Sequence, residues 1–282
     1  MRRDMWLPYL LLAPSALFLA IFFIYPFLDV FTLAFQYEGD WSWENFRIMH
    51  TDFNFAPALQ NTLLLALAVV PIQVCLALAM AMAISKLSKG RDSILYIWTI
   101  PLGISDLAAG IIWLALLEQY GFINTFLAHI GIIENAESWL NYQHPAALFF
   151  AVVIAELWRA TAIVLVILVA GVGLIPKEYA EAAEVFGANA WQRFYKITLP
   201  LLRPSLQTAL ILRTLLAFEV FAVVIVLGGI DLPVLMGETF KWQFEYRDAG
   251  VASAYAVLIL GISVVFTLFY LWALKVPEEA QG

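Results

Sequence analysis

The sequence predicts an all-α integral membrane protein, and two observations carry this prediction. Of the 282 residues, 63% are hydrophobic and only 13% are charged, whereas soluble domains average about 45–50% apolar and about 25% charged residues. Residues 5–28, 53–85 and 249–274 contain no Asp, Glu, Lys or Arg, and about 20 such residues suffice for a helix to cross a bilayer. A soluble enzyme, a nucleic-acid-binding protein and a disordered chain are therefore excluded.

We expect six transmembrane helices in a single transmembrane domain that covers residues 1–282. Three of them follow the uncharged runs, and three are apolar segments that each hold charged residues. The third is interrupted by Pro101 and Asp106. The first run is too long for a signal peptide and has no small-residue cleavage site, so we expect a retained helix. The predicted spans are 7–34, 58–84, 94–117, 145–171, 204–228 and 250–274.

The distribution of basic residues predicts the orientation. Ten of the 15 Lys and Arg residues lie before the first span, in the second and fourth connections, or after the last span. Three lie in the other connections, and two lie within spans. Because cytoplasmic loops carry the excess of Lys and Arg, both termini are expected in the cytoplasm.

Charged residues inside a membrane are costly, and each one is a candidate for function. Glu156 and Arg159 are three residues apart on one helix, so they can either form a structural pair or line a path. Arg213 is expected to snorkel towards the cytoplasm or to hold helices together. Glu219 has no evident partner on its own helix, and either pathway lining or pairing with another helix would explain it. Asp106 lies near the middle of its predicted span and is a further candidate for lining a path.

The connection at 172–203 has the pattern of a docking element. Pro176 suits the first turn of a new helix, which we expect to run to Phe186 and to end at Gly187. One face of this helix holds Tyr179, Ala182, Ala183 and Phe186, and the other holds glutamates. Amphipathic helices that lie on lipid are usually rich in Lys and Arg, so the glutamates favour contact with a protein. A second short helix is expected, with Trp191, Phe194, Tyr195 and Thr198 on one face.

The residues of this connection carry a family resemblance. Glu181-Ala182-Ala183, three residues, Gly187, nine residues and then Ile197-Thr198-Leu199-Pro200 resemble the EAA signature of membrane subunits of binding-protein-dependent ABC importers. Weaker local motifs extend along nearly the whole chain, among them Leu12 to Ala16, Asn61-Thr62-Leu63 and Glu156 to Arg159. These motifs are similar to the carbohydrate branch, the maltose/glycerol-phosphate-like sugar permeases.

The resemblance implies a permease subunit with the type I importer fold and a cytoplasmic coupling helix. Its expected partners are a second homologous permease, two ATPase subunits that bind ATP and Mg, a solute-binding protein and a carbohydrate substrate. That substrate class includes sugars, oligosaccharides, polyols and glycerol phosphates. The expected location is the prokaryotic plasma (inner) membrane, and nucleic acid is not an expected partner. The residues implied to couple the chain to the ATPase are Glu181, Ala182, Ala183, Gly187, Ile197, Leu199 and Pro200.

Catalytic motifs are missing from the sequence. No G-x-x-x-x-G-K-[ST] phosphate-binding loop, H-E-x-x-H or G-x-S-x-G occurs, so we expect no catalytic residue, metal or cofactor in this chain. The alternative to the importer is a secondary carrier or channel with six spans, which would tolerate a bulky residue at position 187.

The candidates for lining a substrate path are Asp106, Glu156, Arg159 and Glu219. Trp98, Trp113, Trp158 and Gln73 offer aromatic and hydrogen-bonding groups for a sugar, but the spacing assigns none of them.

Overall fold

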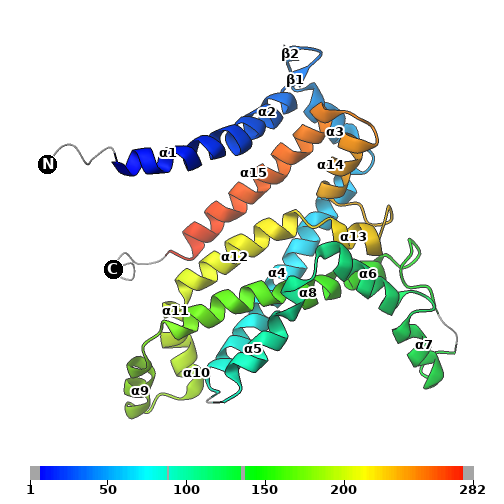
Figure 1. Cartoon of the computed structure of the whole chain (residues 1–282). Coiled ribbons are helices and arrows are strands. Elements are labelled where there is room, and N and C mark those ends of the chain that lie inside the picture. Colours follow the sequence, from blue (N-terminus) through cyan, green and yellow to red (C-terminus); the bar gives the residue numbers. More distant parts are fainter. Residues whose placement is uncertain (1–6, 88, 135–136, 276–282) are drawn as a thin grey trace. The chain divides into compact units, whose positions relative to one another are not determined.

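The computed structural model describes residues 7–87, 89–134 and 137–275. Arg2 and Arg3, which are the basic residues before the first predicted span, lie outside the described residues. The described part is almost entirely helical (Figure 1). Its elements are α1 (Leu7–Leu19), a π-helical turn (Ala20–Ile24), α2 (Tyr25–Ala34), β1 (Gln36–Tyr37), β2 (Asp40–Trp41), α3 (Glu44–Thr51), α4 (Phe55–Ser85), α5 (Arg91–Thr99), a 3₁₀ turn (Ile100–Gly103), α6 (Asp106–Leu117), α7 (Phe122–His129), α8 (Pro145–Gly173), α9 (Lys177–Val185), α10 (Ala190–Arg193), a second π-helical turn (Phe194–Thr198), α11 (Leu199–Leu201), α12 (Arg203–Phe218), α13 (Ala222–Leu227), α14 (Leu235–Phe244) and α15 (Ala249–Ala273).

Five helical segments in the described part are long and apolar enough to cross a membrane. They are Tyr9–Ala34, Phe55–Ser85, Asp106–His129, Pro145–Gly173 and Ala249–Ala273. Four of them match the spans predicted at 7–34, 58–84, 145–171 and 250–274, so those predictions of long helices are confirmed. The other two predicted spans are divided in the structure.

The segment predicted as one span at 94–117 consists of two helices. Pro101 lacks an N–H group and cannot continue the hydrogen-bond ladder of α5, so a 3₁₀ turn follows. Ser105 then caps α6, with its hydroxyl accepting from the backbone N–H of Ala108 at 3.2 Å. Asp106 therefore lies in the first turn of a helix rather than in the middle of one, and the long apolar segment begins there and extends to His129.

The segment predicted as one span at 204–228 is also interrupted. Helix α12 ends at Phe218, and α13 begins at Ala222 after an irregular stretch. The apolar composition continues across this break, which is why the sequence pattern did not show it. The break matters for the site below, because Glu219 lies in it.

The described residues form two compact units. The first comprises the residues up to Ala56 together with Met236–Leu260. In this unit, the buried amide of Asn45 donates to the carbonyls of Leu33 at 3.0 Å and Gln36 at 2.8 Å, and so caps the end of α2. A side chain at Gly250 would lie 2.7 Å from Asn45 Nδ2, so glycine lets α15 begin against this cap.

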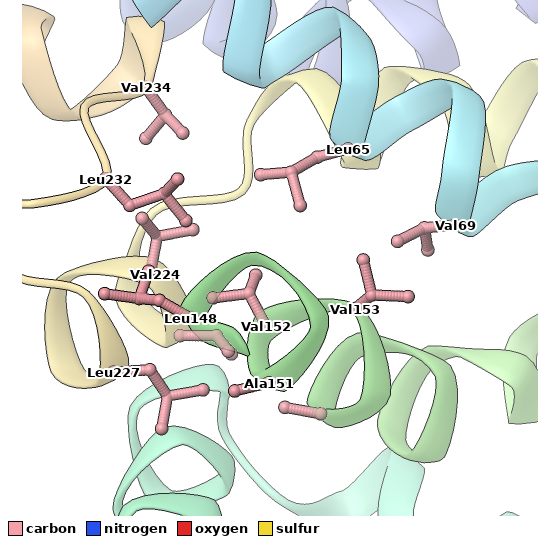
Figure 2. Packing of buried hydrophobic residues seen from close by; sticks show 12 residues of the cluster. Leu65, Val69, Leu148, Ala151, Val152, Val153, Val224, Leu227, Leu232 and Val234 are labelled. Atoms are coloured by element: carbon pink, nitrogen blue, oxygen red, sulfur yellow. The ribbon is translucent and has the colours of Figure 1, made fainter. Parts of the chain in front are cut away.

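The second unit, Pro57–Leu235 with the residues after Leu260, has two apolar cores. In the first, Leu65 and Val69 of α4 face Val152 and Val153 of α8, with Val224 of α13 close by (Figure 2). The second core joins α4, α8 and α12 nearer to the 172–203 connection. Its buried members are Ala77, Ala81, Ile84, Val164, Leu165, Leu168, Val169, Leu202, Leu206 and Ala209. Together these cores hold α8 and α12 side by side (Figure 1).

Candidate functional site

The predicted docking helix is present as α9, and Gly187 ends it as expected. Gly187 has φ +79°, the left-handed conformation that favours glycine. Its N–H donates to the carbonyl of Glu184 at 2.9 Å, and the N–H of Ala188 donates to the carbonyl of Ala183 at 2.9 Å. This pair of bonds is the Schellman motif. No other atom lies within 4 Å of a side chain built at Gly187, so its backbone conformation alone requires glycine.

The next helix is held in place by local polar contacts. Asn189 and Gln192 form a reciprocal capping box at the start of α10, with bonds of 2.8 and 2.9 Å. Arg193 of α10 reaches back to Glu184 of α9 at 2.5 Å. The two short helices are thus fixed against each other by the turn, the cap and this ion pair.

Apolar side chains of the connection are exposed in the chain. Phe186 is 91% exposed, Val185 85% and Trp191 72%. Glu181 and Ala182 are also exposed, and Ala183 is half-buried. A cluster of exposed apolar residues on a rigid segment is typical of a surface that another protein covers.

The later residues of the signature lie closer to the helical core. Ile197, Leu199 and Pro200 are half-buried in the second π-helical turn and α11. Leu199 packs against the core that α4, α8 and α12 share. The second half of the signature therefore attaches the connection to the long helices, whereas the first half faces outward.

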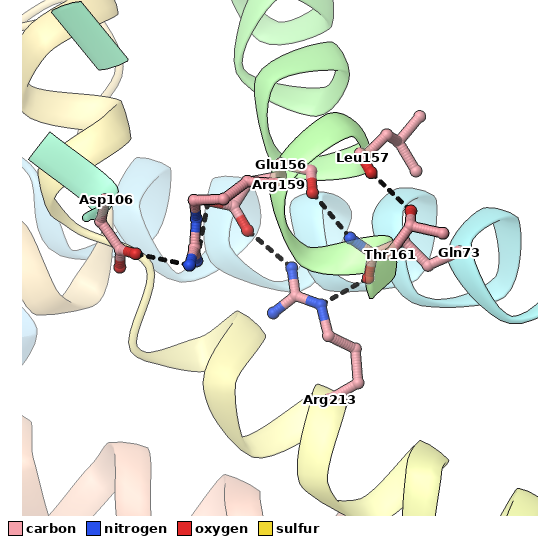
Figure 3. Close-up of polar contacts among 7 residues, drawn as sticks. All are labelled: Gln73, Asp106, Glu156, Leu157, Arg159, Thr161 and Arg213. Atoms are coloured by element: carbon pink, nitrogen blue, oxygen red, sulfur yellow. Dashed lines mark hydrogen bonds and ion pairs between the residues drawn. The ribbon is translucent and has the colours of Figure 1, made fainter. Parts of the chain in front are cut away.

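A buried polar network joins three of the long helices (Figure 3). Arg213 of α12 donates through Nη2 to Glu156 Oε2 of α8 at 2.7 Å, and through Nε to Gln73 Oε1 of α4. Gln73 Nε2 in turn donates to the backbone carbonyl of Glu156 at 2.8 Å. These three side chains are no more than 2% exposed. Removal of either Glu156 or Arg213 would leave the other as an unpaired buried charge, which is strongly destabilising.

The network continues to α6 through a second guanidinium. Arg159 Nη1 lies 2.7 Å from Asp106 Oδ1, and Arg159 Nη2 lies 3.9 Å from Glu156 Oε1. The side chain of Arg159 is 16% exposed and that of Asp106 is 50% exposed. Two carboxylates and two guanidiniums are brought together, so their formal charges cancel.

The network corrects two expectations about intramembrane charges. Snorkelling of Arg213 is wrong, because its side chain is 1% exposed and pairs with Glu156, so the helix-packing alternative is the one observed. The Glu156–Arg159 contact expected from their spacing is present only at 3.9 Å, and each residue has a closer partner on another helix. Gln73 completes the network, although its only sequence signal was a polar side chain in an apolar run.

Glu219 is not part of this network. It follows the last residue of α12, with φ −92° and ψ 3°, and it is exposed. In the part of the chain that the structure describes, its carboxylate has no hydrogen bond or ion pair. Of the four predicted path residues, the structure therefore brings together Asp106, Glu156 and Arg159 and leaves Glu219 apart.

Trp98, Trp113 and Trp158 line one hollow of about 290 Å³ between α4, α8 and the α5–α6 segment. The rest of its lining is apolar except for Thr161, whose hydroxyl already donates to the carbonyl of Leu157. A carbohydrate would leave most of its hydroxyl groups unpaired there, which is costly. The hollow therefore suits an apolar contact better than a sugar.

Comparison with known proteins defines the class. Residues 73–276 match the family model described as binding-protein-dependent transport system inner membrane component. The arabinooligosaccharides transport system permease protein AraP of Bacillus subtilis (strain 168) is 30% identical over 98% of this chain and 90% of its own length. The trehalose/maltose transport system permease protein MalF of Thermococcus litoralis is 35% identical over 65% of this chain and 62% of its own length.

A solved structure agrees with this assignment at the level of the fold. A chain of a bacterial ABC transporter involved in the import of the acidic polysaccharide alginate has a TM-score of 0.85 and 23% identity. The superposition covers 97% of this chain and 96% of that one.

The chain belongs to the family of binding-protein-dependent transport system inner membrane components. It is a multi-pass inner membrane protein and the permease subunit of an ABC importer. As a permease it is a non-catalytic subunit that carries no cofactor, and ATP is bound by the separate ATPase.

Proposed function

We propose that this permease, paired with a second homologous permease, forms the path for a carbohydrate delivered by a solute-binding protein. The names of AraP and MalF, which refer to arabinooligosaccharides and to trehalose and maltose, support this substrate class. Sugars, oligosaccharides, polyols and glycerol phosphates are its members. Two ATPase subunits drive the transport from the cytoplasmic side.

The exposed α9–α10 segment is the observation that carries the proposal. Phe186 and Trp191 present apolar surface to the outside of the chain, on helices fixed by Gly187 and by the Asn189 cap. We assign contact with the ATPase to Glu181, Ala182, Ala183 and Gly187. Ile197, Leu199 and Pro200 transmit the contact, because they join this segment to α12.

The packing of α8 and α12 explains how the contact would move the path. The two helices flank the docking segment, by which we mean α9 and α10 with the turn between them (residues 177–193). They share an apolar core and are joined by the Glu156–Arg213 ion pair. A displacement of the docking segment therefore moves both helices together. Such rigid-body motion, driven by closure of the ATPases, alternates the access of the path.

The topology completes the proposal. The fifth span is α12 with α13, both termini are cytoplasmic, and the third span crosses the membrane with its break near Pro101. Irregular backbone at membrane depth is tolerated where it lines a cavity or is covered by protein. Asp106, Glu156, Arg159 and Glu219 are the candidate path residues of this subunit, and the whole chain is one transmembrane domain.

Backbone substitutions at position 187 test the docking segment. Gly187→Val puts a β-branched residue in the left-handed region, whereas Gly187→Asn is tolerated better there. We expect Gly187→Val to lose ATPase co-purification and ATP-driven uptake at least about tenfold, and Gly187→Asn to keep most of both. The readouts are mass spectrometry of the complex purified in mild detergent and uptake by proteoliposomes.

Gly131→Val is the matched control, because Gly131 has φ +76° and nothing within 4 Å of an added side chain. It should leave both readouts unchanged. Solute movement by the chain alone without ATP would contradict the importer and support a carrier or channel. Normal coupling after both Glu181 and Gly187 are altered would show that the docking segment is elsewhere.

A further inference from the structure

The buried polar network lies at the depth of the hydrocarbon core. Arg159 is the central residue of α8, one of the helices long and apolar enough to cross the membrane. The 29 residues of α8 extend for about 43 Å. Because the hydrocarbon core is about 30 Å thick, the centre of α8 lies inside it even when the whole overhang is on one side. Asp106 pairs with Arg159 at 2.7 Å and therefore lies at this depth too (Figure 3).

The network reaches the surface of the chain at Asp106. The side chain of Asp106 is 50% exposed and that of Arg159 is 16% exposed, whereas Glu156 and Arg213 are buried. A half-exposed carboxylate in contact with lipid tails is costly, and charges inside a membrane almost always face a water-filled cavity or other protein. The surface around Asp106 is therefore covered by water or by protein rather than by lipid.

The backbone beside Asp106 is an independent indication of water. The 3₁₀ turn Ile100–Gly103 and the two residues after it separate α5 from α6, and Gly103 and Ser105 are exposed. An interrupted helix leaves backbone groups outside the regular hydrogen-bond ladder. Such backbone is tolerated inside a membrane only where it lines a water-filled cavity or is buried in protein. Because Gly103 and Ser105 are not buried in this chain, the break fits the wall of a water-filled path.

The guanidinium of Arg159 has donors to spare. Its Nε is buried and has no hydrogen-bond partner among the described residues, and its Nη2 is 3.9 Å from Glu156 Oε1, which is too long for a hydrogen bond. A buried donor without a partner marks a place where ordered water or a ligand is expected. Nη1 of Arg213 also lacks a partner in the described part, but Arg213 is too deeply buried for a solute to reach. At the surface, Asp106 adds an acceptor beside the donors of Arg159, and a sugar hydroxyl uses both kinds of group.

We infer that Asp106 and Arg159 bind hydroxyl groups of the transported carbohydrate where it passes the break between α5 and α6. The inference rests on the proposed function and names a solute contact within it. One hydroxyl donates to the Asp106 carboxylate, and a neighbouring hydroxyl accepts from the Arg159 guanidinium. Charge-assisted bonds of this kind are strong. Glu156 is buried beneath the pair and does not touch the solute, but it neutralises Arg213 and lies beside Arg159.

Thiol labelling tests whether the break faces water. A side chain at Gly103 meets no atom within 4 Å, so Gly103→Cys is made in a Cys75→Ser background. Wild-type Cys75 is the matched control, because it is exposed on α4 and lies two residues after Gln73, at the depth of the network. In the whole complex in lipid nanodiscs, Gly103→Cys should react with a charged methanethiosulfonate at least about tenfold faster than Cys75, because a thiol ionises readily only in water. Equal rates, or no reaction of Gly103→Cys, would overturn the inference.

Protection of the same thiol by solute tests the hydroxyl contact. The complex with its binding protein is first reconstituted in ATP-loaded proteoliposomes and offered trehalose, maltose and arabinotriose. A probe that enters should slow the labelling of Gly103→Cys at millimolar concentration without the binding protein. Added to that variant, Asp106→Asn should raise the half-protecting concentration at least about tenfold, whereas Asp106→Glu, which keeps the carboxylate, should raise it less.

Glu118→Gln, at an exposed carboxylate that follows α6, is the matched control for charge and should leave the half-protecting concentration unchanged. Retention of the ATPase during purification checks that each variant assembles. Uptake of a probe without protection of the thiol, or equal protection in Asp106→Asn, would overturn the inference and leave the proposed function intact. Absence of ATP-dependent uptake of every probe by the wild-type complex would overturn the proposed function itself.

Discussion

The docking segment and the buried polar network are opposites in the same unit of the molecule. Around α9 and α10, apolar side chains such as Phe186 are exposed, whereas between α4, α8 and α12 charged side chains such as Arg213 are buried. The side chains of the network find their partners within the chain, whereas Phe186 and Val185 of the segment are almost fully exposed. Burial of a charge is tolerated only when it is paired, and exposure of an apolar cluster marks an interface. The buried network therefore holds this subunit together, and the docking segment has the exposed surface that we propose for contact with the ATPase.

The largest effect is expected from breaking the ion pair at the centre of the network. Arg213→Met leaves the Glu156 carboxylate buried without a counter-charge, so it should lower the stability of the purified chain by about 3–5 kcal/mol. Thermal unfolding in detergent measures the loss. Arg203→Met, at an exposed arginine that begins the same helix, is the control. Equal stability of the two variants would show that the pair contributes nothing.

The next largest effect is expected at a close contact between α8 and α12. A side chain at Gly171 would lie 2.2 Å from Ser205 Oγ and 2.8 Å from Leu202 Cδ1. Gly171→Val should therefore force the helices apart and destabilise the chain by about 1–3 kcal/mol. Gly173→Val, two residues further on, meets no atom within 4 Å and should cost much less. The same unfolding measurement compares them, and a larger loss for Gly173→Val would contradict the observed helix contact.

A smaller effect is expected from the cap that orders the docking segment. Asn189→Ala removes the capping box of α10, which should cost about 1 kcal/mol locally. Because α10 lies outside the apolar cores, global unfolding should change little while amide hydrogen exchange of residues 188–193 speeds up. Asn141→Ala, at a half-buried asparagine far from this segment in the sequence, should leave exchange in this segment unaltered. Unchanged exchange in Asn189→Ala would mean that the cap does not order α10.

The smallest effect on stability is expected at the exposed apolar cluster itself. Phe186→Ser should change the stability of the isolated chain by no more than about 0.5 kcal/mol, because the ring is almost fully exposed. Its ATPase affinity should nevertheless fall at least about tenfold, as measured by retention of the ATPase during purification. Phe53→Ser, at a ring that is 92% exposed in the other unit, is the matched control and should retain the ATPase. A large loss of stability in Phe186→Ser would contradict the contrast between the two regions.

Local features of the docking segment could be predicted because they depend on neighbouring residues. The turn at Gly187 ends α9 through the bond of its own N–H to Glu184 and the bond of the Ala188 N–H to Ala183, and all of these residues lie within five positions of one another. The long helices were predicted equally well, since an uncharged run of sufficient length leaves few alternatives in a bilayer. The assignment of the signature residues to the ATPase contact stays a prediction.

Features that join distant segments were missed or only partly foreseen. Arg213 meets Glu156 and Gln73 from 57 and 140 residues away, and no periodicity connects these positions. The apolar sequence around Phe218 did not predict the interruption between α12 and α13, which ends before Ala222. Asn45 likewise caps α2 from a separate helix, a role that its polar character alone did not reveal.

The sequence by itself determined the class of the protein, four of its long helices and the turn at Gly187. Each of these follows from composition or from residues a few positions apart, where the physics of the bilayer and of backbone conformation leaves little choice. Only the tertiary structure decided which charge neutralises which, and that Glu219 pairs with none of the residues that the structure describes. Pairing of buried charges depends on the positions of side chains from helices far apart in the chain, and local sequence does not encode those positions.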